Sequence, residues 1–172
     1  GQFSESSALN SAKALYFFSL GLPAFAMIKV FSNFFFANHD TKTPFYISLV
    51  SVILNILISI YFFRSIGFII IPIATSISSW FNTIILLIVL RNRSLFSFNE
   101  IFISRFLKIV FSSVVMGVFF NYLMILFQNQ LDFNQDLKSF YLIFSVVLGA
   151  CFYLFLSYLI KAFKLEDIKL KY

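Results

Sequence analysis

Five long apolar runs, almost free of charged residues, constrain this chain more than any other feature of its sequence. They cover about residues 14–37, 43–63, 65–90, 109–131 and 139–160. A helix needs about 20 residues to cross the hydrocarbon core of a membrane, and every run is long enough. Backbone groups in lipid must bond to one another, and no run alternates polar with apolar residues as a membrane strand does. The sequence therefore predicts an all-α, polytopic transmembrane helix bundle with five spans.

Composition supports a membrane protein and excludes several classes of site. Only 12% of the 172 residues are charged and 60% are hydrophobic, whereas about a quarter of an average soluble domain is charged. One cysteine, Cys151, allows no internal disulfide, and one histidine, His39, assembles no metal cluster. We expect no metal, no cofactor and no bound nucleic acid. A membrane-embedded lipid-modifying enzyme would need a His or carboxylate cluster, and His39 and Asp40 are too few.

The basic residues predict how the chain is oriented. If the five runs cross the membrane in turn, one side carries many more Lys and Arg residues than the other, with Lys29 left inside the first span. Cytoplasmic loops carry this excess, so the N-terminus is predicted outside and the C-terminus in the cytoplasm. The richer side holds Lys42, Arg91, Arg93, Arg105, Lys108, Lys161, Lys164, Lys169 and Lys171, and the other side holds Lys13, Arg64 and Lys138.

A short polar tip, residues 38–43, joins the first two runs and is closed by Pro44. An apolar span, a polar tip and a second apolar span are typical of a membrane hairpin. Proline is favoured at the first position of a helix, so Thr43 is the expected N-cap, with Asp40 as a further capping group.

Polar or small residues recur on one face of four predicted spans. They favour either helix packing, in which small residues permit close approach, or a polar wall facing a cavity. Asn55 and Asn82 are the best cavity candidates, because a buried amide needs several partners or water. The four sets are Ser48, Ser51, Asn55 and Ser59; Pro72, Thr75, Ser79 and Asn82; Ser113, Gly117 and Asn121; and Ser145 and Gly149.

Lys29 is the one basic residue inside a predicted span. A lysine in lipid is costly and indicates a transport pathway or a paired charge, although its long stem also allows it to reach toward the interface. Pro23 in the same span removes a backbone hydrogen bond and predicts a kink, with Gly21 adding flexibility. Pro72 predicts a second kink, inside the third span. Broken helices of this kind are common in transporters.

The longest connection, residues 91–108, interleaves apolar and charged residues. It is interpreted either as an amphipathic helix lying in the cytoplasmic interface or as a plain polar loop. The chain divides into residues 1–93, with three spans, and residues 94–172, with this link, two spans and a solvated tail. Because the chain begins with Gly1 and an odd number of spans starts outside, we expect a piece of a longer protein.

Distinctive residues are spread over about residues 12–93. They are Ala14-Leu15-Tyr16, Gly21-Leu22-Pro23-Ala24-Phe25, Lys29-Val30, Phe35-Phe36-Ala37, Asp40-Thr41-Lys42-Thr43-Pro44, Asn55, Gly67, Ala74-Thr75-Ser76, Trp80, Asn82, Leu86-Leu87 and Arg91. This set of residues resembles the MurJ (MviN) family of bacterial lipid II flippases. The tip, together with the upstream Gly-Leu-Pro-Ala-Phe and lysine, makes the resemblance fairly specific. Departures at Phe36, His39 and Asn33 do not disturb it.

The resemblance implies a fold of the MOP exporter superfamily, of which this chain would be the last five of fourteen helices. It implies a transporter, not an enzyme, that carries lipid-linked peptidoglycan precursor across the bacterial inner membrane by alternating access and serves cell-wall synthesis and cell shape. The lipid-linked substrate, the bilayer and the missing N-terminal helices would be its partners. Lys29, Asn55 and Asn82 would lie on the substrate path or cavity, and residues 40–44 (Asp40, Thr41, Lys42, Thr43 and Pro44) would form a cytoplasmic gate or hinge.

Two alternatives remain open at this point. One is another flippase of the same superfamily, acting on a polyprenyl-diphosphate-linked oligosaccharide. The other is a membrane assembly subunit with no transport path. The first lobe of the longer protein would separate the flippases, and a solvated groove beside Lys29 would argue against the assembly subunit.

Overall fold

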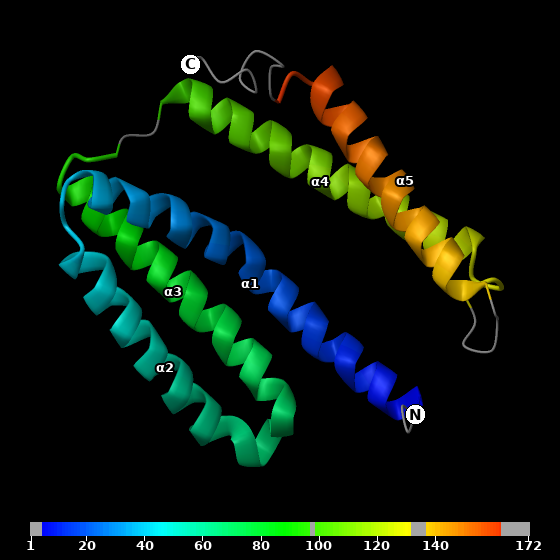
Figure 1. Ribbon diagram of the computed structural model, residues 1–172, viewed down its shortest axis with the longest axis horizontal. Coiled ribbons are helices and arrows are strands. Elements are labelled where there is room, and N and C mark those ends of the chain that lie inside the picture. The colour runs from blue at the N-terminus through cyan, green and yellow to red at the C-terminus, as the bar shows by residue number, and fades with distance from the viewer. Residues whose placement is uncertain (1–4, 97–98, 132–136, 163–172) are drawn as a thin grey trace. The chain divides into compact units, whose positions relative to one another are not determined.

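The computed structural model describes residues 5–96, 99–131 and 137–162, and every regular element among them is helical (Figure 1). The all-α prediction is confirmed. The chain forms two compact units, Gly1–Ser97 and Phe98–Tyr172. In chain order the elements are α1 (Glu5–Ala37), α2 (Lys42–Ile66), the 3₁₀ turn η1 (Gly67–Ile69), α3 (Ile70–Asn92), α4 (Glu100–Leu126) and α5 (Lys138–Leu159).

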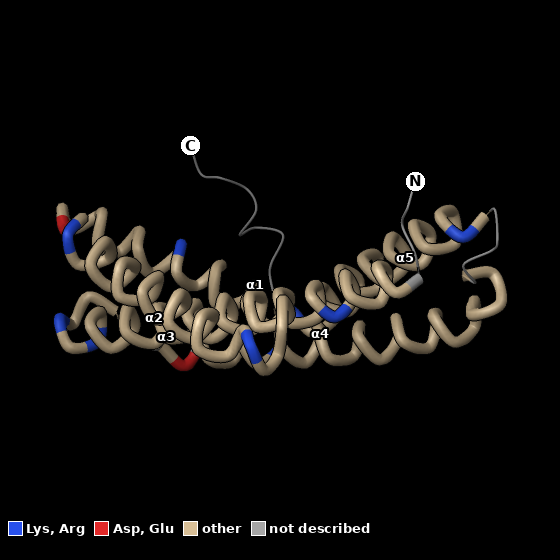
Figure 2. The backbone as a smooth tube through the Cα atoms, turned by 90° about the horizontal axis from the view of Figure 1, so that it is seen from below, with Lys and Arg blue, Asp and Glu red and all other residues tan. Residues whose placement is uncertain are grey.

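Four helical stretches of the described chain are long and apolar enough to cross a membrane, where the sequence predicts five. The predicted spans 43–63 and 65–90 form one 51-residue stretch, Lys42–Asn92, because only η1 separates α2 from α3. The count of five separate stretches is therefore wrong. Figure 2 shows that long parts of the helices carry no charged residue. The other three stretches are Ser6–Ala37, Phe102–Leu126 and Lys138–Leu159.

In the first unit α3 packs against both α1 and α2, whereas α1 and α2 barely touch each other. α1 runs parallel to α3, and α2 returns antiparallel to it (Figure 1). Near the tip, Phe31 and Phe35 of α1 pack with Leu86 and Leu90 of α3 in a buried apolar cluster. The three helices are therefore joined through α3.

Gly21 is a packing residue of α1. Its Cα approaches α3 so closely that an added Cβ would lie 2.9 Å from Ser76 Oγ and 3.2 Å from Ser76 Cα. Small residues allow membrane helices to approach in this way. The predicted flexibility of Gly21 is not needed to explain its presence, because any larger residue would push α1 away from α3.

The sharp change of direction in the first unit lies at Gly67, between α2 and α3. Its φ of 73° and ψ of −153° belong to a region that is essentially restricted to glycine. Pro72 was predicted to kink the third span from inside. It lies instead in the first turn of α3, where a proline interrupts little of the helix. α1, by contrast, continues through Pro23 as one helix.

The second unit is a hairpin of α4 and α5. The Phe119 and Phe152 rings stack at 4.3 Å between centroids, and the buried Gly149 lies against the Phe120 ring. The predicted small-residue stripe of the fourth span, Ser113, Gly117 and Asn121, does not form this contact: Ser113 and Asn121 are exposed, and nothing lies within 4 Å of a Cβ added at Gly117. The α4 side of the interface is formed by larger residues such as Phe119 and Phe120, and the small residue at the contact is Gly149 of α5.

The long connection between the third and fourth spans is shorter than predicted. Residues 91 and 92 still belong to α3, and α4 begins at Glu100, so residues 100–108 are its first turns. Neither a separate interfacial helix nor a plain loop over 91–108 is present in the described part of the link. The predicted solvated tail, from residue 163 on, lies outside the described residues.

Candidate functional site

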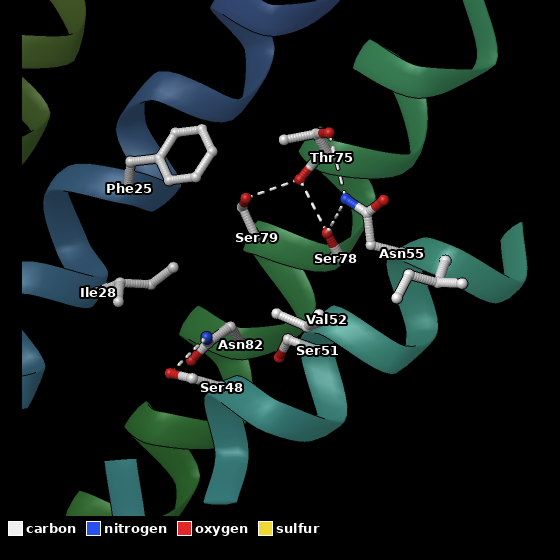
Figure 3. Close-up of a pocket in the computed structure, with 11 residues that line it drawn as sticks. Phe25, Ile28, Ser48, Ser51, Val52, Asn55, Thr75, Ser78, Ser79 and Asn82 are labelled. Carbon is white, nitrogen blue, oxygen red and sulfur yellow. Dashed lines mark hydrogen bonds between the residues drawn. The ribbon is translucent and has the colours of Figure 1, made fainter. Parts of the chain in front are cut away.

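A polar cleft lies in the first unit, with α3 between α2 and α1 as its floor (Figure 3). Its volume is about 300 Å³. Asn55 and Asn82, both predicted as cavity residues, line it together. Phe25 and Ile28 contribute the apolar wall from α1. The remaining lining residues are Ser48, Ser51, Val52, Ile56, Thr75, Ser78 and Ser79.

The two asparagines join α2 to α3 across the cleft. The Asn55 amide donates to the hydroxyls of Thr75 and Ser78, each at 3.2 Å. The Asn82 amide donates to Ser48 Oγ at 3.3 Å. Asn82 lies later in α3 than Thr75 and Ser78, and its partner Ser48 lies earlier in α2 than Asn55, as an antiparallel hairpin requires. Asn82 Oδ1 is buried and accepts no hydrogen bond from the described residues.

Three α3 side chains donate hydrogen bonds to the backbone of α1. Ser76 Oγ donates to the Phe17 carbonyl, and Trp80 Nε1 donates to the Leu20 carbonyl at 2.9 Å. Thr83 Oγ1 donates to the Ala24 carbonyl at 3.1 Å, in the same register. These carbonyls lie within two turns of Pro23, where the missing N–H loosens the helix. The carbonyl that Pro23 leaves without its backbone donor is that of Ser19, four residues earlier, so these bonds do not replace the lost one. They form a seam of three hydrogen bonds that holds α1 on α3.

A polar clasp at the tip joins α1, α2 and α3; we define it as Asp40, Thr43 and Arg93. Arg93 Nη1 pairs with Asp40 Oδ2, and Arg93 Nη2 donates to Thr43 Oγ1 at 3.1 Å. The Thr43 hydroxyl donates to Asp40 Oδ2 at 2.6 Å and its N–H to Asp40 Oδ1 at 3.0 Å. The guanidinium also lies over the Phe35 ring, 5.8 Å from its centroid. One arginine thus ties the end of α3 to the tip.

The clasp keeps Asp40 charged. The hydroxyl and N–H of Thr43, followed by the Arg93 guanidinium, hold the pKa of the Asp40 carboxyl well below its ordinary value of 3.8. Hydrogen bonds to a carboxylate favour its ionised form. Thr43 is not the N-cap that the sequence predicts: α2 begins at Lys42, and Asp40 caps it from outside, which leaves Pro44 in the first turn.

The other predicted site residues are placed less centrally. Lys29 is exposed, does not line the cleft and makes no ion pair or hydrogen bond with the described residues. It lies one residue after Ile28 and one turn after Phe25, both of which do line it. Thr41 and Lys42 are exposed at the tip, whereas Pro44 is buried.

Sequence reasoning missed the roles of Arg93 and of the residues in the α1–α3 seam. Arg93 was predicted only as one of the charges that orient the chain. The charge pattern already assigned Arg93 and the tip to the same side of the membrane. That shared side was the one hint in the sequence that Arg93 could pair with Asp40, which lies 53 positions earlier. Trp80 and Ser76 were noted only as family residues, and Thr83 gave no signal, because nothing local shows which helix will face it.

The family model described as lipid II flippase MurJ matches residues 1–142. The chain belongs to the MurJ family. This confirms the resemblance seen in its tip and first spans. A probable lipid II flippase MurJ of Rickettsia prowazekii is 42% identical over 82 residues, which are 48% of this chain and 16% of that protein.

Two further relatives carry the same name over more of the chain. A probable lipid II flippase MurJ of Rhizobium meliloti is 32% identical over 117 residues, which are 68% of this chain and 22% of that protein. The lipid II flippase MurJ of Thermosipho africanus is 30% identical over 157 residues, which are 91% of this chain and 29% of that protein. This MurJ-family chain therefore spans between 16% and 29% of the length of these three relatives.

Proposed function

We propose that this chain is part of a lipid II flippase, a transporter that carries lipid-linked peptidoglycan precursor across the bacterial inner membrane by alternating access. The match of the MurJ family over residues 1–142 carries this proposal. Membrane-length helices and an open cleft with polar residues between them are what such a carrier needs. The rest of the longer protein would supply the remaining helices of the path.

We infer five membrane crossings, two of them in the stretch Lys42–Asn92. Its two arms, α2 and α3, fold back on each other at Gly67, and each is long enough to cross the hydrocarbon core. The clasp supports this topology, because it requires the α1–α2 tip and the end of α3 to lie on one side. The excess of Lys and Arg assigns that side to the cytoplasm, with the start of the chain outside.

In this proposal the cleft residues Asn55 and Asn82 belong to the substrate path, and Lys29 contacts anionic substrate at its edge. Residues 40–44 act as the cytoplasmic gate or hinge. The clasp supports that role, because Arg93 ties the tip to α3 and the tip can move independently only when this pair opens. Pro23 is the proposed flexible point of α1.

Transport of labelled lipid II by the reconstituted full-length protein tests the proposal. We expect the wild type to move lipid II between leaflets and Lys29→Ala to slow transport about tenfold, the effect of losing about 1.4 kcal/mol of substrate interaction. Lys29→Arg should retain most of the rate. Lys13→Ala, which removes another exposed lysine of α1, serves as the matched control.

The outcomes separate the two claims. A wild-type protein that moves no lipid II would refute the flippase function itself. A Lys29→Ala protein that transports as fast as Lys13→Ala would leave the function intact and remove Lys29 from the path.

A further inference from the structure

The buried oxygen of Asn82 marks the cleft as a place for a ligand. Asn82 is only 6% exposed, and its Oδ1 accepts no hydrogen bond from the described residues while its amide nitrogen donates to Ser48. A buried acceptor without a donor is energetically unfavourable. Asn82 lines the cleft (Figure 3), and a donor that reaches its enclosed oxygen when the lining side chains shift would satisfy this acceptor.

Two further hydroxyl groups of the cleft, those of Ser51 and Ser79, also present acceptors, because their hydrogens are already used. Ser51 Oγ donates to the Ile47 carbonyl at 2.9 Å, and Ser79 Oγ donates to the Thr75 carbonyl at 2.6 Å. A hydroxyl that donates its one hydrogen to its own helix keeps only lone pairs for a ligand. The cleft therefore offers oxygen acceptors from Asn82, Ser51 and Ser79.

The Asn55 amide, the main donor group of the cleft, is occupied. Its nitrogen bonds to both Thr75 and Ser78, so its hydrogens join α2 to α3. None of the described lining side chains is charged. A phosphate diester or diphosphate accepts hydrogen bonds at neutral pH and carries negative charge, so an acceptor-rich, uncharged cleft disfavours it. Neutral groups that donate, such as hydroxyls and amide N–H groups, fit the lining.

Size and depth agree with such a ligand. Asn55 and Asn82 lie near the middle of α2 and α3, which is where carriers hold their substrates. A volume of about 300 Å³ is at the small end of ligand pockets and suits one sugar ring or a short piece of peptide.

We propose that this cleft binds the neutral, hydrogen-bond-donating part of the lipid-linked precursor, its sugars or its peptide, and not its diphosphate. The inference rests on the proposed flippase function and names the part of the substrate that the cleft recognises. Asn82 accepts from the ligand, and Ser51 and Ser79 add further acceptors.

Binding by the purified full-length protein tests this with three probes: undecaprenyl diphosphate, the same lipid carrying the disaccharide without peptide, and lipid II. We expect Asn82→Leu to weaken lipid II binding at least about tenfold and to leave undecaprenyl diphosphate binding unchanged. If the disaccharide lipid loses affinity as well, the cleft holds a sugar. If only lipid II loses affinity, the cleft holds the peptide.

Two variants guard against a general loss of structure. Asn121→Leu makes the same change on the exposed face of α4, outside the cleft, and should bind all three probes as the wild type does. Ser79→Ala removes an acceptor oxygen whose hydroxyl hydrogen bonds within α3. It should therefore leave the packing of the helices intact and weaken lipid II binding several-fold without affecting undecaprenyl diphosphate.

Three results would overturn the inference. Equal lipid II affinity in Asn82→Leu, Ser79→Ala and Asn121→Leu would refute the cleft site while leaving the flippase function standing. An equal loss of undecaprenyl diphosphate and lipid II binding would show that the cleft serves the diphosphate or the fold. A wild type that binds no lipid II would refute the proposed function and this inference together.

Discussion

Among individual residues, the Asp40 carboxylate is a charge held by several partners at once. It accepts two hydrogen bonds from Thr43 and pairs with Arg93, although its side chain remains in contact with solvent, at 23% exposure. A group with this exposure is screened by water and salt. The ion pair itself therefore contributes little free energy. The clasp matters mainly because its several contacts hold the tip in one position against the end of α3.

We expect Asp40→Asn to lower the thermal midpoint of the protein in detergent at pH 7. Because the folded-state pKa of Asp40 is depressed, its stabilisation is present above the ordinary value of 3.8 and is lost as the pH falls further, through the folded-state pKa. The wild type and the variant should therefore differ by a constant amount from about pH 8 to about pH 5, and converge only in stronger acid. Glu100→Gln, the same type of change on an exposed acid of α4, is the control. A difference that vanished near about pH 6 would contradict this account.

His39 follows the end of α1 in a left-handed conformation, with φ at 57°. The Asp40 N–H bonds to the Phe35 carbonyl and the His39 N–H to the Phe36 carbonyl, as in a Schellman motif, which glycine favours at this position. We expect His39→Gly to stabilise the chain by about 0.5–1 kcal/mol. Glycine removes the strain of the left-handed conformation, and this gain exceeds the extra conformational entropy that glycine gives the unfolded chain. The change in stability is measured as a shift in the thermal unfolding midpoint. Ala37→Gly, inside the helix, should shift the midpoint in the opposite direction, and equal effects would refute the assignment.

Among the helices, the seam between α1 and α3 depends on close approach. The hydrogen bonds from α3 hydroxyl and indole groups to α1 carbonyls lie on either side of Gly21, where the two backbones approach closely. In lipid, helix association relies on packing and hydrogen bonds, since the surrounding tails are as apolar as the helices. α1 and α3 therefore act as one packed pair, against which α2 is held by the Asn55 and Asn82 contacts.

We expect Gly21→Ala to destabilise the first unit by about 1–3 kcal/mol, because the new Cβ would clash with Ser76 and force the seam apart. The matched control is Gly117→Ala in α4, where nothing lies within 4 Å of the added methyl group. That change should be neutral or stabilising by up to about 1 kcal/mol. Comparing the two unfolding midpoints in detergent decides the matter, and a Gly21→Ala protein as stable as Gly117→Ala would show that the helices do not meet at Gly21.

For the molecule as a whole, the number of membrane crossings depends on the turn at Gly67. Four apolar stretches and five crossings agree only if Lys42–Asn92 turns back there. Single cysteines in a Cys151→Ser background, labelled from one side of the intact membrane, test this. Thr41→Cys and Lys161→Cys should react from the cytoplasmic side, and Ser65→Cys from the other side. Reaction of Thr41→Cys and Ser65→Cys from the same side would refute the five-crossing topology.

The helical class and the integral-membrane character could both be predicted from the amino-acid sequence. Both follow from the free energy of moving a short segment from water into lipid. A run of about 20 apolar residues with few charges is stable in lipid as a helix that crosses the membrane. The tip motif and the upstream residues were also enough to identify the MurJ family. The tip, predicted over residues 38–43, does lie between the first two helices, but α2 already starts at Lys42 and takes its cap from Asp40.

Which helix faces meet depends on the three-dimensional arrangement of the chain and could not be predicted. The pairing of Asp40 with Arg93, the burial of the Asn82 oxygen and the exposure of Lys29 join or separate residues that lie far apart in the sequence. The small-residue stripe of α4 shows the same limit, because small residues at helical spacing fit a packed face and a free one equally well. In a membrane the lipid is as apolar as any helix interface, so the hydrophobic pattern fixes where a helix lies but not which neighbour it contacts.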